Sequence, residues 1–246
     1  MSKSLSKLNL DPGKSNAIKL YHGSPNAVLT PTFGLGEDKH DYGRGFYLTP
    51  DKELAKEWAV SGRPGVDGWL YSYTLDCTGL RILNFETLEK NRALYWMAEL
   101  ILHREPDEVS RGANYDICRK FFLKRFGANT QNYDVVCGWR ADDSYFQVAT
   151  RFLSDGLALP LLEEALRLGE LGIQYCCRSE KAFDQLSVSC DPEPVDRSYR
   201  DSYFERDSRG RRAFTELYNS PANSVLADRI VLSDLVKAYI KGGGKL

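Results

Sequence analysis

The stretch GRGFYLTPDKELAKEWA, residues 43–59, contains two different hydrophobic patterns in immediate succession. Residues 45–49 combine aromatic and aliphatic side chains, which is typical of a short strand. Pro50 and Asp51 then mark the beginning of a helix, and Asp51 is placed to cap its first turn. The apolar residues that recur at helical spacing after this point are Leu54, Ala55, Trp58 and Ala59. The stretch therefore predicts a strand followed directly by an amphipathic helix.

Similar short patterns occur on both sides of this stretch. Strand-like segments lie at residues 18–22, 69–75, 80–85, 133–138, 172–177 and 186–190, and helical patterns at 86–126, 143–169, 179–186 and 225–240. They do not alternate in the regular βαβ order of a doubly wound sheet, so we predict an α+β fold. Residues 25–44, which contain many Pro, Gly, Thr and Asp, predict a long loop. A loop of this length in a compact domain is more often functional than incidental.

The composition favours an ordinary globular protein. Lys and Arg number 33 and Asp and Glu number 34, which gives a formal net charge of -1. A protein that binds nucleic acid non-specifically usually carries a basic excess, because phosphate neutralisation supplies most of its affinity. The six cysteines form no CxxC pair and the three histidines lie in unrelated contexts, so we expect reduced thiols and no metal site.

The start of the chain and its hydropathy indicate where the protein works. Residues 1–16 are polar, predict a flexible tail and lack the apolar core of a signal peptide. No segment approaches the roughly 20 apolar residues that are needed to cross a bilayer. We therefore expect a soluble cytoplasmic protein with no membrane partner. A protein delivered into a target-cell cytoplasm by a specialised secretion route would have the same features.

Three motifs combine histidine, glycine and aromatic residues: YHGS at residues 21–24, GRGFYLT at 43–49, and Trp58. Each alone has an ordinary explanation, as a turn, a strand entry or a core aromatic residue. Their order and spacing, however, resemble the NAD-binding core of ADP-ribosyltransferases of the diphtheria-toxin and poly(ADP-ribose) polymerase class. That class has a His-Gly-(Ser/Thr) strand end and a Gly-x-Gly-(aromatic/aliphatic)-Tyr strand. A second aromatic residue follows the tyrosine by eleven positions, as Trp58 follows Tyr47 here.

Within this superfamily the sequence is most similar to an uncharacterised bacterial branch with glutamine at the glutamate position of the His-Tyr-Glu class. The further segments that carry the likeness are YDVVCG at residues 133–138, ADD at 141–143, Gln174 and Lys181-Ala182. The resemblance implies two small antiparallel sheets, split from each other and surrounded by helices. The resemblance runs from about residue 18 to 195, and with the composition of both ends it gives three parts: a flexible tail (1–16), an ADP-ribosyltransferase-like domain (17–195), and a charged segment with a C-terminal helical extension (196–246).

The resemblance assigns roles in NAD binding to the early motifs. Because Gly23 has no side chain, its backbone N–H and C=O can approach the carboxamide of nicotinamide closely. His22 and Ser24 would contact ribose hydroxyls. The rings of Tyr47 and Trp58 would enclose the pyridinium through stacking and cation–π attraction.

The strand entry at residues 43–45 and the third position of the class each allow a second explanation. Gly45 would belong to the NAD-binding residues and Arg44 would reach the pyrophosphate, although a solvated loop arginine fits Arg44 equally well. Gln174 stands where active members have a glutamate, and an amide can hold a ribose hydroxyl but brings no charge. Either a nearby carboxylate such as Asp143 assists, or catalysis has been lost; Asp143 also fits a helix N-cap. If missing charge alone limits the chemistry, Gln174→Glu should raise turnover.

These features predict an NAD-dependent mono-ADP-ribosyltransferase. Its catalytic residues would be His22, Tyr47, Gln174 and Asp143, with NAD as substrate, no metal, and a single ADP-ribose passed to a macromolecular acceptor. The near-neutral charge favours a protein acceptor over a nucleic acid. Two alternatives stay open: a weak or inactive module that binds NAD or ADP-ribose, and an NAD glycohydrolase that acts as a toxin or defence protein.

Overall fold

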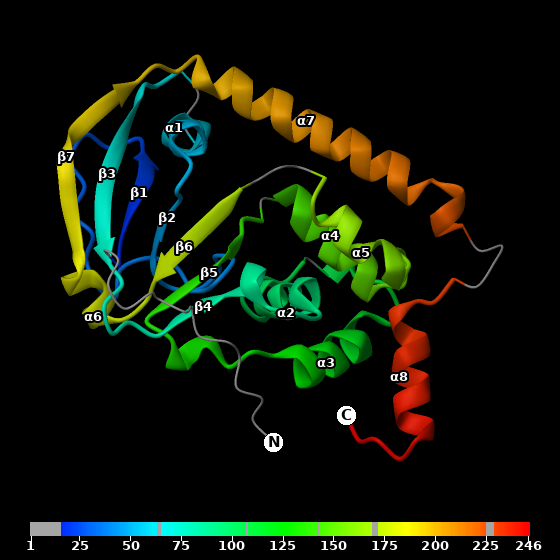
Figure 1. Ribbon diagram of the computed structural model, residues 1–246. Helices are drawn as coiled ribbons and strands as arrows, with labels where there is room; N and C mark the ends of the chain where they lie inside the picture. Colours follow the sequence, from blue (N-terminus) through cyan, green and yellow to red (C-terminus); the bar gives the residue numbers. More distant parts are fainter. Residues whose placement is uncertain (1–15, 63–64, 107, 142, 169–171, 225–228) are drawn as a thin grey trace. The chain divides into compact units, whose positions relative to one another are not determined.

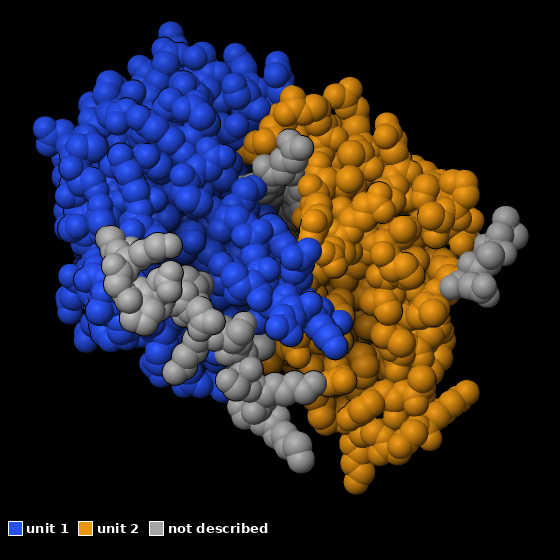
Figure 2. Space-filling model, in the orientation of Figure 1, with its two compact units in different colours: residues 1–92, 129–140, 171–205 blue, residues 93–128, 141–170, 206–246 orange. Residues whose placement is uncertain are grey.

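The chain folds into two compact units (Figure 2). The computed structural model describes residues 16–62, 65–106, 108–141, 143–168, 172–224 and 229–246. The first unit comprises residues 1–92, 129–140 and 171–205, and the second comprises 93–128, 141–170 and 206–246. The division does not follow the boundary predicted at 195 and 196, because the helical insertions within the first 195 residues group with the C-terminal helices. Residues 1–15, for which a flexible tail is predicted, lie outside the described residues.

The first unit contains a three-stranded antiparallel sheet. Its order is β1-β3-β7, with β1 at Ala17–Ser24, β3 at Gly68–Asp76 and β7 at Leu186–Val195 (Figure 1). The central strand β3 reads WLYSYTL, a run of aromatic and aliphatic residues with the composition of a strand that is covered on both faces. The predicted strand at 186–190 continues to Val195, so β7 spans the full length of β3.

The second sheet of this unit is mixed. Its order is β2-β6-β5-β4, with β2 at Phe46–Leu48, β6 at Ile173–Cys177, β5 at Val135–Trp139 and β4 at Ile82–Asn84. The prediction of two antiparallel sheets is wrong at one place, since β4 pairs with β5 in parallel. A parallel pair needs a long crossover, and the chain between these strands carries two helices of the second unit, α2 (Arg92–His103) and α3 (Tyr115–Phe126). The α+β class with two small sheets is confirmed.

The core of the first unit draws on both sheets. Its main hydrophobic cluster consists of Leu20, Leu48, Tyr71, Tyr73, Leu75, Cys77, Leu80, Ile82, Val135, Cys177 and Ala182, the last from α6 (Glu180–Asp184). Helix α1 (Lys52–Ser61) packs on the first sheet through a second cluster, formed by Ala55, Ala59, Val60, Leu70 and Val195 (Figure 1). Since side chains alternate along β3, Leu70 faces α1 while its neighbour Tyr71 faces the main cluster.

The second unit is helical. It contains α2 (Arg92–His103, from Ala93), α3 (Tyr115–Phe126), α4 (Asp143–Leu153), α5 (Leu162–Ala165), α8 (Leu232–Lys241) and most of α7 (Tyr199–Tyr218). Short 3-10 turns of this unit lie at Glu108–Ser110, Leu159–Leu161 and Pro221–Asn223, and those of the first unit lie at Phe85–Thr87 and Thr130–Asn132. The charged residues 196–212, predicted as a solvated or mobile segment, form much of the largely exposed helix α7. Among the helices of the described ranges, none is long and apolar enough to cross a membrane.

Candidate functional site

The His-Gly end of β1 and the strand β2 lie edge to edge in the first unit. The Tyr21 amide donates to the Thr49 carbonyl at 2.7 Å, and the Thr49 amide donates back to the Tyr21 carbonyl at 2.8 Å. At the next residue of β1, a side-chain hydrogen bond takes the place of a backbone bond between β1 and β2. The Nδ1 of His22 donates to the Tyr47 carbonyl oxygen at 2.7 Å. Two motifs separated in sequence by the long loop therefore meet at this junction.

The bond to Tyr47 determines the state of the His22 ring. A carbonyl oxygen can only accept, so Nδ1 carries the proton and Nε2 of the neutral ring is an acceptor. Burial lowers the pKa of His22 below its usual value, although the backbone hydrogen bond opposes this effect. The ring is half-buried, with its centroid 4.6 Å from that of Phe46. Within the described part of the chain Nε2 has no hydrogen-bond partner, so a neutral acceptor is available to a hydroxyl.

Gly23 lies in β1 at the point where the pairing of β1 with the β2 segment stops. Tyr21 directs its N–H and C=O toward Thr49, and Gly23, two residues on, directs its own groups to the same side. Continued pairing would join Gly23 to Tyr47, but the His22 ring has taken the Tyr47 carbonyl instead. On its other face Gly23 contacts α1 so closely that a Cβ would lie 2.5 Å from the Ala59 backbone nitrogen. Glycine is therefore required here for helix packing, and its backbone groups lie at the edge where the pairing with β2 stops.

Ser24 and Gly45 have structural roles that explain their residue types. The buried Ser24 hydroxyl accepts from the Asn26 amide at 3.2 Å and so closes the turn after β1. A Cβ on Gly45 would lie 2.6 Å from the Cys177 carbonyl oxygen, so glycine here allows the close approach of β2 to β6.

Tyr47 is fixed by the loop that precedes it. Its hydroxyl donates to the Gly43 carbonyl at 2.6 Å and accepts from the Tyr42 amide at 3.0 Å. The Tyr42 ring lies parallel to it, with centroids 6.4 Å apart, and the His40 ring meets it edge-on at 5.4 Å. Burial, with smaller contributions from the charges of Cys176 and Asp41, raises the pKa of Tyr47 far above its usual value. The side chain is thus a rigid, neutral ring.

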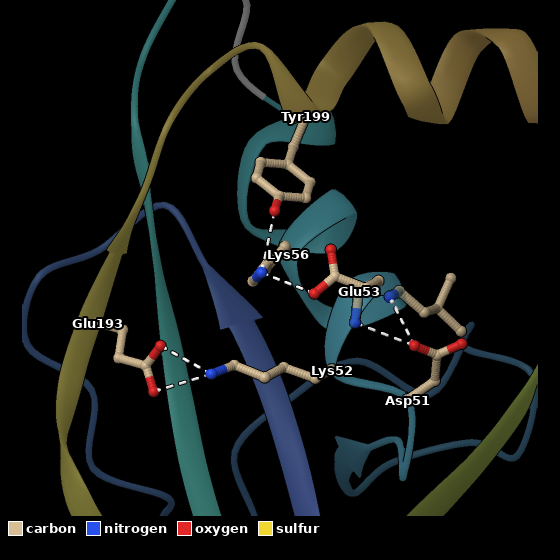
Figure 3. Close-up of polar contacts among 7 residues, drawn as sticks. Asp51, Lys52, Glu53, Lys56, Glu193 and Tyr199 are labelled. Atoms are coloured by element: carbon tan, nitrogen blue, oxygen red, sulfur yellow. Dashed lines mark hydrogen bonds and ion pairs between the residues drawn. The ribbon is translucent and has the colours of Figure 1, made fainter.

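Helix α1, which carries Trp58, is held at its first turns by polar contacts (Figure 3). The Asp51 carboxylate accepts from the Glu53 and Leu54 amides, which confirms the predicted N-cap. Lys52 forms an ion pair with Glu193 of β7 at 2.9 Å. Such partly exposed pairs contribute roughly 0–1 kcal/mol each, so they mainly fix the orientation of the helix on the sheet.

The ring of Trp58 already has a planar cation on it. The guanidinium of Arg140, which follows β5, lies 5.2 Å from the Trp58 ring centroid. The indole Nε1 is buried and has no hydrogen-bond partner among the described residues. The rings of Trp58 and Tyr47 do not contact each other directly in the described structure, and each has its own partner. The Trp58 face therefore suits a flat, positively charged group.

Gln174 lies on the same face of the second sheet as Tyr47. The register sets Tyr47 opposite Cys176, and Gln174 precedes Cys176 by two residues, so the three side chains share a face. Gln174 is 4% exposed, and its amide nitrogen donates to the Asp41 carboxylate at 2.8 Å. Sequence reasoning did not single out Asp41. The available signal was a carboxylate in the long loop two residues before the Gly-x-Gly segment.

Two predicted residues are not brought into this group. Arg44 pairs with Asp38 at 2.8 Å and lines a cavity of about 400 Å³ together with Gly45, Arg81 and Arg178. Asp143 begins α4 in the second unit, and its side chain, like the whole of residue 142, lies outside the description. No cluster of three or more potential metal ligands occurs among the residues described.

The comparisons with known proteins place the chain in a family. The family model described as "Protein of unknown function (DUF3990)" matches residues 18–188. The chain belongs to the DUF3990 family. The match to DUF3990 begins in β1 and ends in β7, so it contains the whole group around His22, Tyr47 and Gln174, and it stops before α7. A search of curated proteins found no match.

Proposed function

We propose that this DUF3990 protein binds NAD and transfers one ADP-ribose from it to a macromolecular acceptor. The observation that carries the proposal is the junction of β1 and β2. There the His22 ring takes the Tyr47 carbonyl, and the N–H and C=O of Gly23 form no pairing with β2 among the described residues. A donor and an acceptor on one residue match the edge of a carboxamide, the group that distinguishes nicotinamide from a simple pyridine.

The neighbouring side chains suit the other parts of the ligand. Nε2 of His22 accepts a hydrogen bond from a ribose hydroxyl while the ring is neutral. The pyridinium of NAD is a flat cation, as is the guanidinium that now covers Trp58. A bound pyridinium would replace the Arg140 guanidinium on the Trp58 ring. The Tyr47 ring, on β2, is held in place by its hydroxyl bond to the Gly43 carbonyl.

The reaction breaks the bond between ribose C1′ and the nicotinamide ring nitrogen. The electron pair of that bond goes to the nitrogen, so nicotinamide leaves as a neutral molecule and positive charge develops on the ribose. The acceptor nucleophile then bonds to C1′ and releases its proton to solvent. Gln174 supports this step as an acceptor, since its amide nitrogen is engaged with Asp41 and its amide oxygen is directed away from that carboxylate. A protein acceptor is favoured by the balanced charge.

The test measures NAD binding by calorimetry and nicotinamide release by chromatography, with and without a cell lysate. Trp58→Ala should weaken NAD binding about 2- to 30-fold, which corresponds to the roughly 0.5–2 kcal/mol of a cation–π contact. Trp58→Phe keeps an aromatic face and serves as the matched control. His22→Ala and Tyr47→Ala should also weaken binding.

The outcomes separate the possible activities. Release that depends on lysate supports transfer, release without lysate supports hydrolysis to ADP-ribose, and binding without release supports a recognition module. If the unaltered protein does not bind NAD, or if the His22, Tyr47 and Trp58 variants all bind it as well as the unaltered protein, the proposal is wrong.

A further inference from the structure

The buried contact between Gln174 and Asp41 joins two parts of the chain that are far apart in sequence. Asp41 belongs to the loop before β2 and Gln174 to β6, and both side chains lie in the first unit. Asp41 is 6% exposed and Gln174 is 4% exposed. The Gln174 amide nitrogen donates to Asp41 Oδ2 at 2.8 Å and, more weakly, to the Trp139 carbonyl at 3.5 Å.

A buried carboxylate is expensive unless hydrogen bonds compensate for lost water. The Gln174 amide supplies such a bond, and the same bond fixes the orientation of the amide. With its nitrogen on Asp41, Gln174 must direct its oxygen elsewhere, as an acceptor for a hydroxyl. The negative charge of Asp41 is also felt by Tyr47 on the same face of the sheet. The carboxylate therefore acts electrostatically at the group of residues to which the reaction is assigned.

We propose that Asp41 is the charged positioning residue of this site. It holds the Gln174 amide in the orientation that accepts a ribose hydroxyl, and it supplies the negative charge that a glutamine lacks. That charge stabilises the positive charge that develops on the ribose as nicotinamide leaves. The inference rests on the proposed NAD chemistry and deepens it, since it explains how a chain with glutamine at this strand can carry out the reaction.

The first test is Asp41→Asn, which keeps an acceptor for the Gln174 amide but removes the charge. The affinity for NAD should change less than about 3-fold, while the rate of nicotinamide release should fall on the order of 100-fold, as when a stabilising group is removed from a charged transition state. Asp38→Asn is the matched control. Asp38 lies in the same loop, is exposed and pairs with Arg44, so its variant should keep the full rate.

The second test exchanges the two partners. Gln174→Glu alone places two carboxylates in contact, so one must take up a proton or they separate, and turnover should not rise. The double variant Asp41→Asn with Gln174→Glu restores one carboxylate and one amide in reversed order. Its rate of nicotinamide release should recover to within about 10-fold of the unaltered protein.

Each outcome decides the inference. Asp41→Asn at the full rate overturns it, and so does a folded, NAD-binding exchange variant that is as slow as Asp41→Asn. A weakened NAD affinity and lowered melting temperature with an unchanged maximal rate shows a purely structural role and also overturns it. If Asp41→Asn does not fold, the exchange variant alone decides. If the unaltered protein binds no NAD, the proposed function itself is wrong. The results for the Asp41 and Gln174 variants bear only on the role of Asp41.

Discussion

Replacing Gly23 by alanine should force α1 away from β1. The added Cβ would lie 2.5 Å from the backbone nitrogen of Ala59 and closer still to the carbonyl oxygen of Ala55. Both are helix backbone atoms, which cannot rotate aside as the end of a flexible side chain can. The Ala55 oxygen would lie 1.8 Å from the added Cβ, and ordinary van der Waals contact begins near 3.4 Å, so the helix must retreat by about 1.6 Å in a closely packed interior.

The expected cost is that of overpacking, about 1–3 kcal/mol. For a chain of this size each 1 kcal/mol lowers the melting temperature by roughly 2–4 °C, so a cost of about 2 kcal/mol corresponds to a decrease of roughly 4–8 °C. Because α1 carries Trp58, the same displacement should weaken NAD binding, and the two effects should occur together.

Thermal unfolding followed by circular dichroism measures the first effect and calorimetry with NAD the second. Gly62→Ala, at the end of the same helix, is the matched control. A Cβ there meets no heavy atom within 4 Å and the φ angle is -79°, so the expected change stays within about 0.5 kcal/mol. If Gly23→Ala and Gly62→Ala unfold at the same temperature, the close packing of β1 on α1 is refuted.

Two further predictions concern titratable groups. Burial lowers the pKa of His22 in the folded protein, so as pH falls through about 6.5 the unfolded chain binds a proton that the folded protein does not. The free energy of unfolding should therefore decrease on acidification by up to about 1.4 kcal/mol per pH unit, and urea titrations of His22→Gln should show a smaller decrease; an equal or larger decrease in the variant would contradict this. Among the thiols, burial raises the pKa of Cys77 to about 11 and that of Cys118 to about 12, whereas Cys190 is exposed. A thiol reagent at pH 8 should modify a single cysteine rapidly in the folded protein, none in Cys190→Ser, and all six after denaturation; several fast thiols in the folded protein would refute the burial.

Local patterns in the sequence were sufficient to identify most elements. Residues 45–49 predict β2, Asp51 predicts the cap of α1, and the aromatic run 69–75 predicts β3, because each depends on neighbours within a few positions. The predicted helical pattern 86–126 divides into α2 and α3, separated by a segment containing Pro106. The charged α7 was not predicted as a helix, since its polar residues gave no apolar stripe from which to recognise one.

The sequence by itself determined the α+β class, the order of the strands along the chain, and the identity of His22, Tyr47, Trp58 and Gln174 as residues of one hypothesis. Only the tertiary structure decided what these residues contact. Three contacts join segments that are far apart in sequence. His22 and the Tyr47 carbonyl are 25 positions apart, and Asp41 and Gln174 are 133 positions apart. The Arg140 guanidinium on Trp58 likewise joins the residue after β5 to α1. Periodicity reports which face of an element is buried, but it carries no information about the path of a long loop. The position of Asp41 depends on that path, and so the charge beside Gln174 became visible only in three dimensions.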